Sequence, residues 1–75
     1  MKTIFIHTEY IQLDQALKKE GIIQTGGEMA SFLDGHKVYL NGNHVTAKRK
    51  KLFSGDILSI DGDSFTITFG VDDEG

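Results

Sequence analysis

The 75-residue chain contains no cysteine, no proline and no tryptophan, and it has no long hydrophobic run. Without cysteine the chain can form no disulfide, no thiolate zinc site and no cysteine nucleophile. Its apolar runs fall short of the roughly 20 residues that span a bilayer, and the stretch at residues 4–6 is too short for a signal peptide. A chain this short also has little volume for a deep catalytic cleft beside its core. We therefore expect one soluble, cytoplasmic domain over residues 1–70.

The sequence shows no arrangement of side chains that is typical of catalysis or of metal binding. His7, His36 and His44 are scattered along the chain, without an HExxH motif or a carboxylate at metal-ligand spacing. The segment Asp61-Gly62-Asp63 lacks the other oxygen ligands of a calcium loop. These absences predict a protein that is not an enzyme and that holds neither a metal ion nor a cofactor.

Charge is distributed unevenly along the chain, although the net charge is only −3. Residues 1–35 carry three bases and five acids, residues 36–55 five bases and no acid, and residues 56–75 six acids and no base. The central segment includes the run Lys48-Arg49-Lys50-Lys51, which has two interpretations: a solvated loop, or a patch that attracts nucleic acid. Residues 71–75 are expected to form a flexible acidic tail.

The first part of the sequence predicts a strand and then a helix. β-branched and aromatic residues over 3–7 favour a strand. Leu13, Ala16 and Leu17 have the i, i+3, i+4 spacing of one helix face. We expect Gly21 to end this helix in a Schellman motif, because glycine readily adopts the left-handed conformation that this motif needs.

A second helix is predicted after a short link. Thr25 and Glu28 have the spacing of a capping box, and the helical pattern then continues to about residue 35. The intervening Gly26-Gly27 pair has two interpretations. The glycines either let the second helix pack closely on the first, or they leave backbone N–H groups free to accept a phosphate.

After the second helix the apolar pattern changes to a period of two, which is typical of strands. Val38 and Leu40 are expected to face the core, while Lys37 and Tyr39 point outward. Tyr39 could stack on an unpaired RNA base, or it could simply pack against a neighbouring strand.

The remaining sequence predicts further strands joined by tight turns. Residues 41–43 form a hairpin turn, and one pairing places Leu40 opposite Val45, although a neighbouring register stays open. Leu52 and Phe53 are expected to anchor the basic loop, residues 48–51. Strands at 57–60 and 65–69 complete about four strands after the helices. Two helices to one side of a small antiparallel sheet make an α+β domain.

Three motifs resemble those of the S-four-type RNA-binding domain, also called the alpha-L motif: Leu13-Asp14-x-x-Leu17, Val38-x-Leu40-Asn41-Gly42 and Lys51-Leu52-x-x-Gly55-Asp56-Ile57. In its Gly26-Gly27 pair and its length, the chain resembles the free-standing branch of this family, the small bacterial proteins of the YaaA type. The resemblance implies a two-helix unit packed on a small sheet. It also implies binding of structured RNA by the helix starts, the hairpin and the basic loop.

The resemblance assigns Thr25, Asn41, Gly42, Gly55 and Asp56 to the framework of the domain. The partner that it implies is ribosomal RNA or a ribosomal particle, in ribosome assembly or translation. We expect no specificity for DNA and no membrane partner; a monomer is favoured, and the sequence leaves the oligomeric state open. The residues expected to contact RNA are Lys18, Lys19, Thr25, Gly26, Lys37, Tyr39, Lys48, Arg49, Lys50 and Lys51.

The chain departs from the family at three positions. The family commonly carries basic residues where this sequence has Gln12, Gly26 and Ala30. These departures motivate an alternative function from another class, a protein–protein interaction adaptor built on an RNA-binding scaffold.

Overall fold

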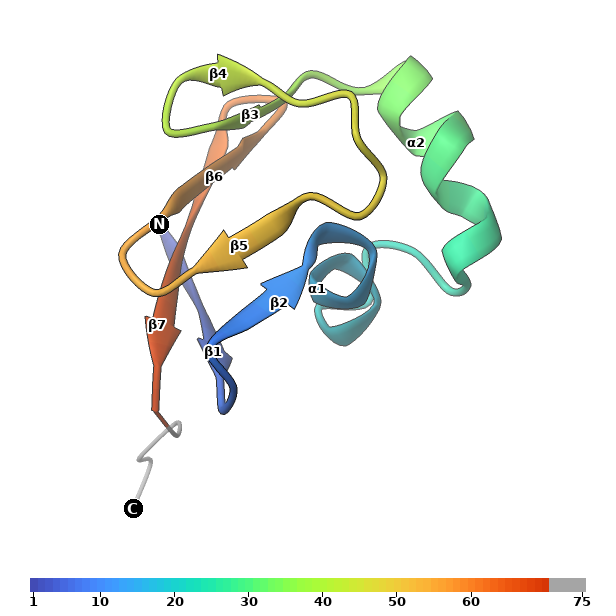
Figure 1. Ribbon diagram of the computed structural model, residues 1–75. Coiled ribbons are helices and arrows are strands. Elements are labelled where there is room, and N and C mark those ends of the chain that lie inside the picture. Colours follow the sequence, from blue (N-terminus) through green and yellow to red (C-terminus); the bar gives the residue numbers. More distant parts are fainter. Residues whose placement is uncertain (71–75) are drawn as a thin grey trace.

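Two helices and a two-stranded ribbon cover one face of a five-stranded sheet in the computed structural model of the protein, which describes residues 1–70 (Figure 1). The acidic tail predicted at residues 71–75 lies outside the described residues. No helix within residues 1–70 combines the length and the apolar character needed to cross a bilayer. In chain order the elements are β1 (Lys2–Ile6), β2 (Tyr10–Gln12), α1 (Leu13–Lys19), the 3₁₀ turn η1 (Gly26–Glu28), α2 (Met29–Gly35), β3 (Val38–Leu40), β4 (Asn43–His44), β5 (Lys51–Phe53), β6 (Ile57–Ile60) and β7 (Asp63–Phe69).

The large sheet has the strand order β1-β7-β6-β3-β4, and β2 pairs with β5 in a separate antiparallel ribbon. Every neighbouring pair in the large sheet is antiparallel except β1 and β7, which are parallel. The predicted α+β class is confirmed. The sheet is mixed rather than wholly antiparallel, because β1, the first strand of the chain, pairs in parallel with β7, the last strand.

Helix α1 ends where the sequence predicted. Gly21 has a φ of 75°. Its N–H donates to the carbonyl of Lys18 at 3.0 Å, and the N–H of Ile22 donates to the carbonyl of Leu17 at 2.9 Å. These two hydrogen bonds define a Schellman motif, so the predicted helix end is confirmed.

The second helix opens with the predicted capping box, which spans the 3₁₀ turn η1 and leads directly into α2. The Glu28 carboxylate accepts the N–H of Thr25 at 3.0 Å and the N–H of Gln24 at 3.2 Å. Two backbone donors at the helix start are therefore satisfied by one side chain.

The β3–β4 hairpin has a different register from the one that the sequence favoured. Asn41 and Gly42 form a two-residue turn with positive φ at both residues, 51° and 85°. Leu40 therefore pairs with Asn43 rather than with Val45. The N–H of Val45 donates instead to the carbonyl of Val38 at 2.9 Å. Because the difference is two residues, Val45 still faces the core, where it is buried.

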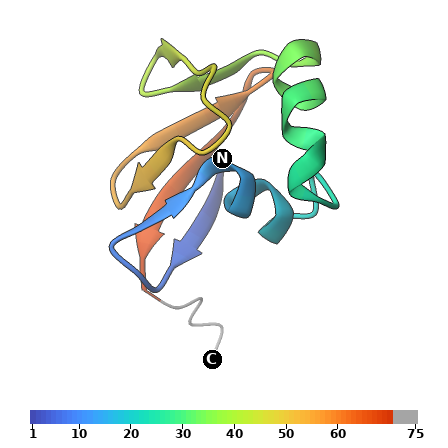
Figure 2. The same cartoon turned by 45° about the vertical axis from the view of Figure 1, so that its right-hand side comes forward.

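The core lies between the large sheet and the elements that cover it. Leu17 of α1, Met29 of α2 and Leu52 of β5 join Val38 and Leu40 of β3 in one buried cluster. Figure 2 shows the helices and the β2–β5 ribbon on the same side of the sheet, which leaves the other face of the sheet uncovered by these elements. Within residues 1–70 no polar or charged residue is buried, so the polar groups that could bind a partner lie at the surface.

Candidate nucleic-acid interface

The basic loop lies at the start of helix α1. Its chain turns at Lys48 and Arg49, and the N–H of Lys50 donates back to the carbonyl of Ala47 at 3.2 Å. The carbonyl of Lys50 accepts the N–H of Leu13, the first residue of α1, at 2.8 Å. The bond between Leu13 and Lys50 therefore holds the loop at the start of the helix, and Figures 1 and 2 show this segment beside α1. The four charged side chains of the loop are exposed.

No carboxylate within residues 1–70 neutralises the basic loop. The single ion pair in this part of the chain joins His36 and Asp61. The four exposed bases of the loop therefore present their charge to solvent, as a site for phosphate groups requires.

The predicted anchoring of the basic loop is half confirmed. Leu52 is completely buried, as expected, but Phe53 is 41% exposed. The prediction for Phe53 was wrong because neighbouring residues of a strand point to opposite faces. With Leu52 directed into the core, Phe53 must lie on the outer face of the ribbon.

Strand β2 brings a residue to this face that the sequence did not single out. Tyr10 pairs with Phe53, and their ring centroids are 5.7 Å apart. The ammonium group of Lys51 lies 4.8 Å from the centre of the Tyr10 ring, within the range of a cation–π interaction. The only sequence signal for this contact is the alternation of residues in two short strands.

The starts of the two helical segments lie close together, and both carry acids. A β-carbon added to Gly26 would lie 3.8 Å from a carboxylate oxygen of Asp14, which is in the first turn of α1. At Gly27 the nearest atom would be 3.7 Å away. Both separations are ordinary contacts, so neither glycine is required for close helix packing. A phosphate contact at Thr25 and Gly26 stays a prediction, and it would have to form beside Asp14 and Glu28.

The other predicted contact residues lie elsewhere on the surface. Lys37 and Tyr39 point away from the core, as expected, so they lie on the uncovered side of the sheet, where the Tyr39 ring is 5.5 Å from that of His44. Lys18 and Lys19 lie near the end of α1 and line a surface hollow with Phe5. The predicted site residues therefore occupy several surfaces, of which the basic loop holds the densest charge.

The motif residues of the two turns meet in a clasp, which we define as Asn41, Asp56 and the backbone of Phe53 and Ile57. The Asn41 amide donates to Asp56 at 3.0 Å and accepts the N–H of Ile57 at 2.9 Å. The second oxygen of Asp56 accepts the N–H of Phe53 at 2.8 Å. The clasp thus joins the β3–β4 turn to the turn between β5 and β6, and it explains why these two motifs occur together.

Comparison with known proteins assigns the family. The family model described as the S4 domain matches residues 4–68, most of the chain. The chain belongs to the S4 domain family. A relative from Bacillus subtilis (strain 168), named "Probable ribosome maturation protein RlbA", is 41% identical over 59 residues, which are 79% of this chain and 83% of the relative.

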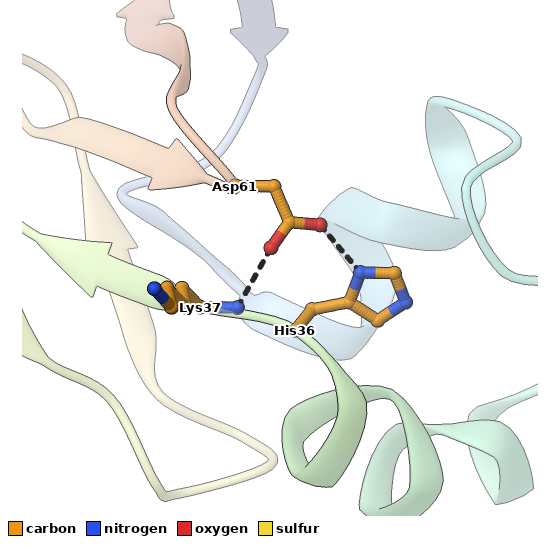
Figure 3. Close-up of polar contacts among 3 residues, drawn as sticks. All are labelled: His36, Lys37 and Asp61. Carbon is orange, nitrogen blue, oxygen red and sulfur yellow. Dashed lines mark hydrogen bonds and ion pairs between the residues drawn. The ribbon is translucent and has the colours of Figure 1, made fainter.

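A second polar joint of this S4 domain links the end of α2 to the turn between β6 and β7 (Figure 3). The Nδ1 atom of His36 lies 2.6 Å from one carboxylate oxygen of Asp61, and the N–H of Lys37 donates to the other at 2.9 Å. The His36 ring stacks on Phe32, with the centroids 4.1 Å apart. The hydrogen bond from His36, followed by that from Lys37, lowers the pKa of Asp61 below its usual range.

Proposed function

We propose that residues 1–70 of this S4 domain form one non-catalytic RNA-binding module. The module docks structured ribosomal RNA on the basic loop, with the neighbouring helix faces as a flank. The observation that carries the proposal is the set of four exposed bases, Lys48, Arg49, Lys50 and Lys51, which lack an acidic partner within residues 1–70. A phosphate backbone is attracted to such a field regardless of its sequence, so the shape of the RNA and the fold provide the selectivity.

The relative's name supports a role in ribosome maturation for the present chain. We extend that role to a cytoplasmic monomer that binds ribosomal RNA or an assembling ribosomal particle. The structure supports a mechanism: a backbone hydrogen bond between Leu13 and Lys50 holds the basic loop at the start of α1, so the backbone of the loop is held in place before RNA arrives. Preorganisation of this kind lowers the entropy cost of binding.

The proposal is tested by replacing Lys48, Arg49, Lys50 and Lys51 with alanine. Affinity for labelled stem-loop fragments of ribosomal RNA, measured by fluorescence anisotropy, should fall by about 100-fold or more. The melting temperature should stay nearly unchanged, because the four side chains are exposed. Lys2→Ala removes one exposed base outside the basic loop, on β1, and should leave the affinity nearly unchanged. A folded loop variant that binds RNA as well as the original chain would refute the proposal.

A second candidate function is a protein–protein interaction adaptor. The observation that favours it is the pair of acids at the helix starts, Asp14 and Glu28, together with the absence of bases at Gln12, Gly26 and Ala30. An adaptor should recover the same protein partner after nuclease treatment. An RNA-binding module should lose its ribosomal partners under that treatment.

A further inference from the structure

The outer face of the β2–β5 ribbon presents two aromatic rings beside the basic loop. Tyr10 and Phe53 face each other across the ribbon, with their ring planes inclined by 45° and their centroids 5.7 Å apart. Tyr10 is half-buried, whereas Phe53 is 41% exposed. The Phe53 ring therefore keeps substantial surface free for a further ring.

One base of the loop, Lys51, continues this aromatic surface along the ribbon. Gln12 and Lys51 form the next pair on the same face, about 7 Å along the strands from Tyr10 and Phe53. Lys51 lies over the Tyr10 ring at 4.8 Å, and the exposed bases Lys48, Arg49 and Lys50 directly precede it in the chain. A nucleotide could place its base on the aromatic pair and its phosphate beside the bases.

Asp56, an acid three residues after Phe53, is already engaged in the clasp. Both carboxylate oxygens of Asp56 accept hydrogen bonds, one from the N–H of Phe53 and one from Asn41. These bonds also fix the backbone that carries the Phe53 ring. The aromatic surface is therefore held in place before a ligand binds, which lowers the entropy cost of stacking.

We infer that Tyr10 and Phe53 form a stacking site for one unpaired nucleobase of the bound RNA. The inference rests on the proposed function and adds the class of RNA, namely structured RNA with an unpaired nucleotide. A paired base keeps its faces inside the helix and cannot reach the rings. Stacking on aromatic side chains tolerates any base, and the uncharged polar groups on this face of the ribbon are only the Tyr10 hydroxyl and the Gln12 amide. The site should therefore select unpaired nucleotides with little preference for their identity.

The test compares two blunt-ended RNA duplexes that differ only in one bulged 2-aminopurine, so that the control duplex has no unpaired base. The original chain should bind the bulged duplex about fivefold more tightly than the fully paired one, and binding should quench the 2-aminopurine fluorescence. Phe53→Ala and Phe53→Leu should both remove this preference and the quenching, while Phe53→Tyr should retain them. Ile57→Ala is the matched control, because Ile57 is also 41% exposed but lies on the uncovered face of the large sheet.

The outcomes separate the stacking site from the proposed function. The inference is overturned if the original chain binds both duplexes equally, or if folded Phe53→Ala and Phe53→Leu variants keep the preference for the bulge. In either case the paired duplex would still bind through the basic loop, so the proposed function would stand. If the original chain binds neither duplex, both the proposed function and the stacking site are wrong.

Discussion

The clasp and the basic loop adjoin each other in the sequence and treat their polar side chains in opposite ways. In the clasp, both polar atoms of the Asn41 amide and both oxygens of Asp56 are hydrogen-bonded. In the basic loop, the backbone is hydrogen-bonded but the four charged side chains are exposed. From this difference we expect substitutions in the clasp to change stability and substitutions in the basic loop to change binding. The family motifs contain the residues of the clasp, whereas the RNA binding that we propose depends on the charged residues between its two halves.

The largest effect on stability is expected in the clasp. Asn41→Ala removes two side-chain hydrogen bonds and places alanine at a φ of 51°. We expect a loss of about 2 kcal/mol in the free energy of unfolding, or about 10 °C in melting temperature. Urea and thermal unfolding followed by circular dichroism measure both quantities.

The matched control for this variant is Asn43→Ala, two residues along the hairpin. The Asn43 side chain is exposed and makes no hydrogen bond to residues 1–70, so its loss should change stability by less than about 0.5 kcal/mol. Equal effects of the two substitutions would show that the clasp contributes nothing specific. The comparison with the basic loop would then fail.

A smaller effect on stability is expected at the joint between His36 and Asp61. There the pH dependence of unfolding reports the contribution of the ionised Asp61 carboxylate. The folded state lowers the pKa of Asp61 below the ordinary value of 3.8. The ionised carboxylate therefore stabilises the fold above about pH 4, and this contribution is lost as pH falls through the lowered pKa. Asp61→Asn should reduce the melting temperature at neutral pH, and the difference from the original chain should shrink in acid.

Asp63→Asn, in the same hairpin, is the control for removing one negative charge. The Asp63 side chain makes no hydrogen bond within the described part of the chain, so its substitution should leave the acid unfolding curve nearly unchanged. A difference between Asp61→Asn and the original chain that stays constant down to pH 2 would contradict the role of the Asp61 carboxylate.

Much of the fold follows from local signals in the sequence. Gly21 ends α1, Thr25 and Glu28 open the second helix, and positive-φ residues make both β-hairpin turns, since each signal acts over a few residues. Strand β2 and the parallel β1–β7 pair have no local signal, because partners far along the chain define them.

In the candidate site, too, the features with a local sequence signal were predicted and those that depend on distant partners were not. The sequence predicts the cluster of positive charge in the basic loop, because its four bases are consecutive. The contact between Tyr10 and Phe53 depends on the pairing of two short strands, so the sequence predicted an RNA contact at neither residue. Phe53 was even assigned to the wrong face, because alternation fixes its direction only once Leu52 is known to be buried.

The dependence of RNA affinity on salt tests the central claim most directly. If the basic loop neutralises about four phosphates, the logarithm of the association constant should fall against the logarithm of salt concentration with a slope of about −3. The variant with alanine at Lys48, Arg49, Lys50 and Lys51 should have a slope near zero at an unchanged melting temperature. Equal slopes for the two proteins would contradict the account, because the charges that bind RNA would then lie outside the basic loop.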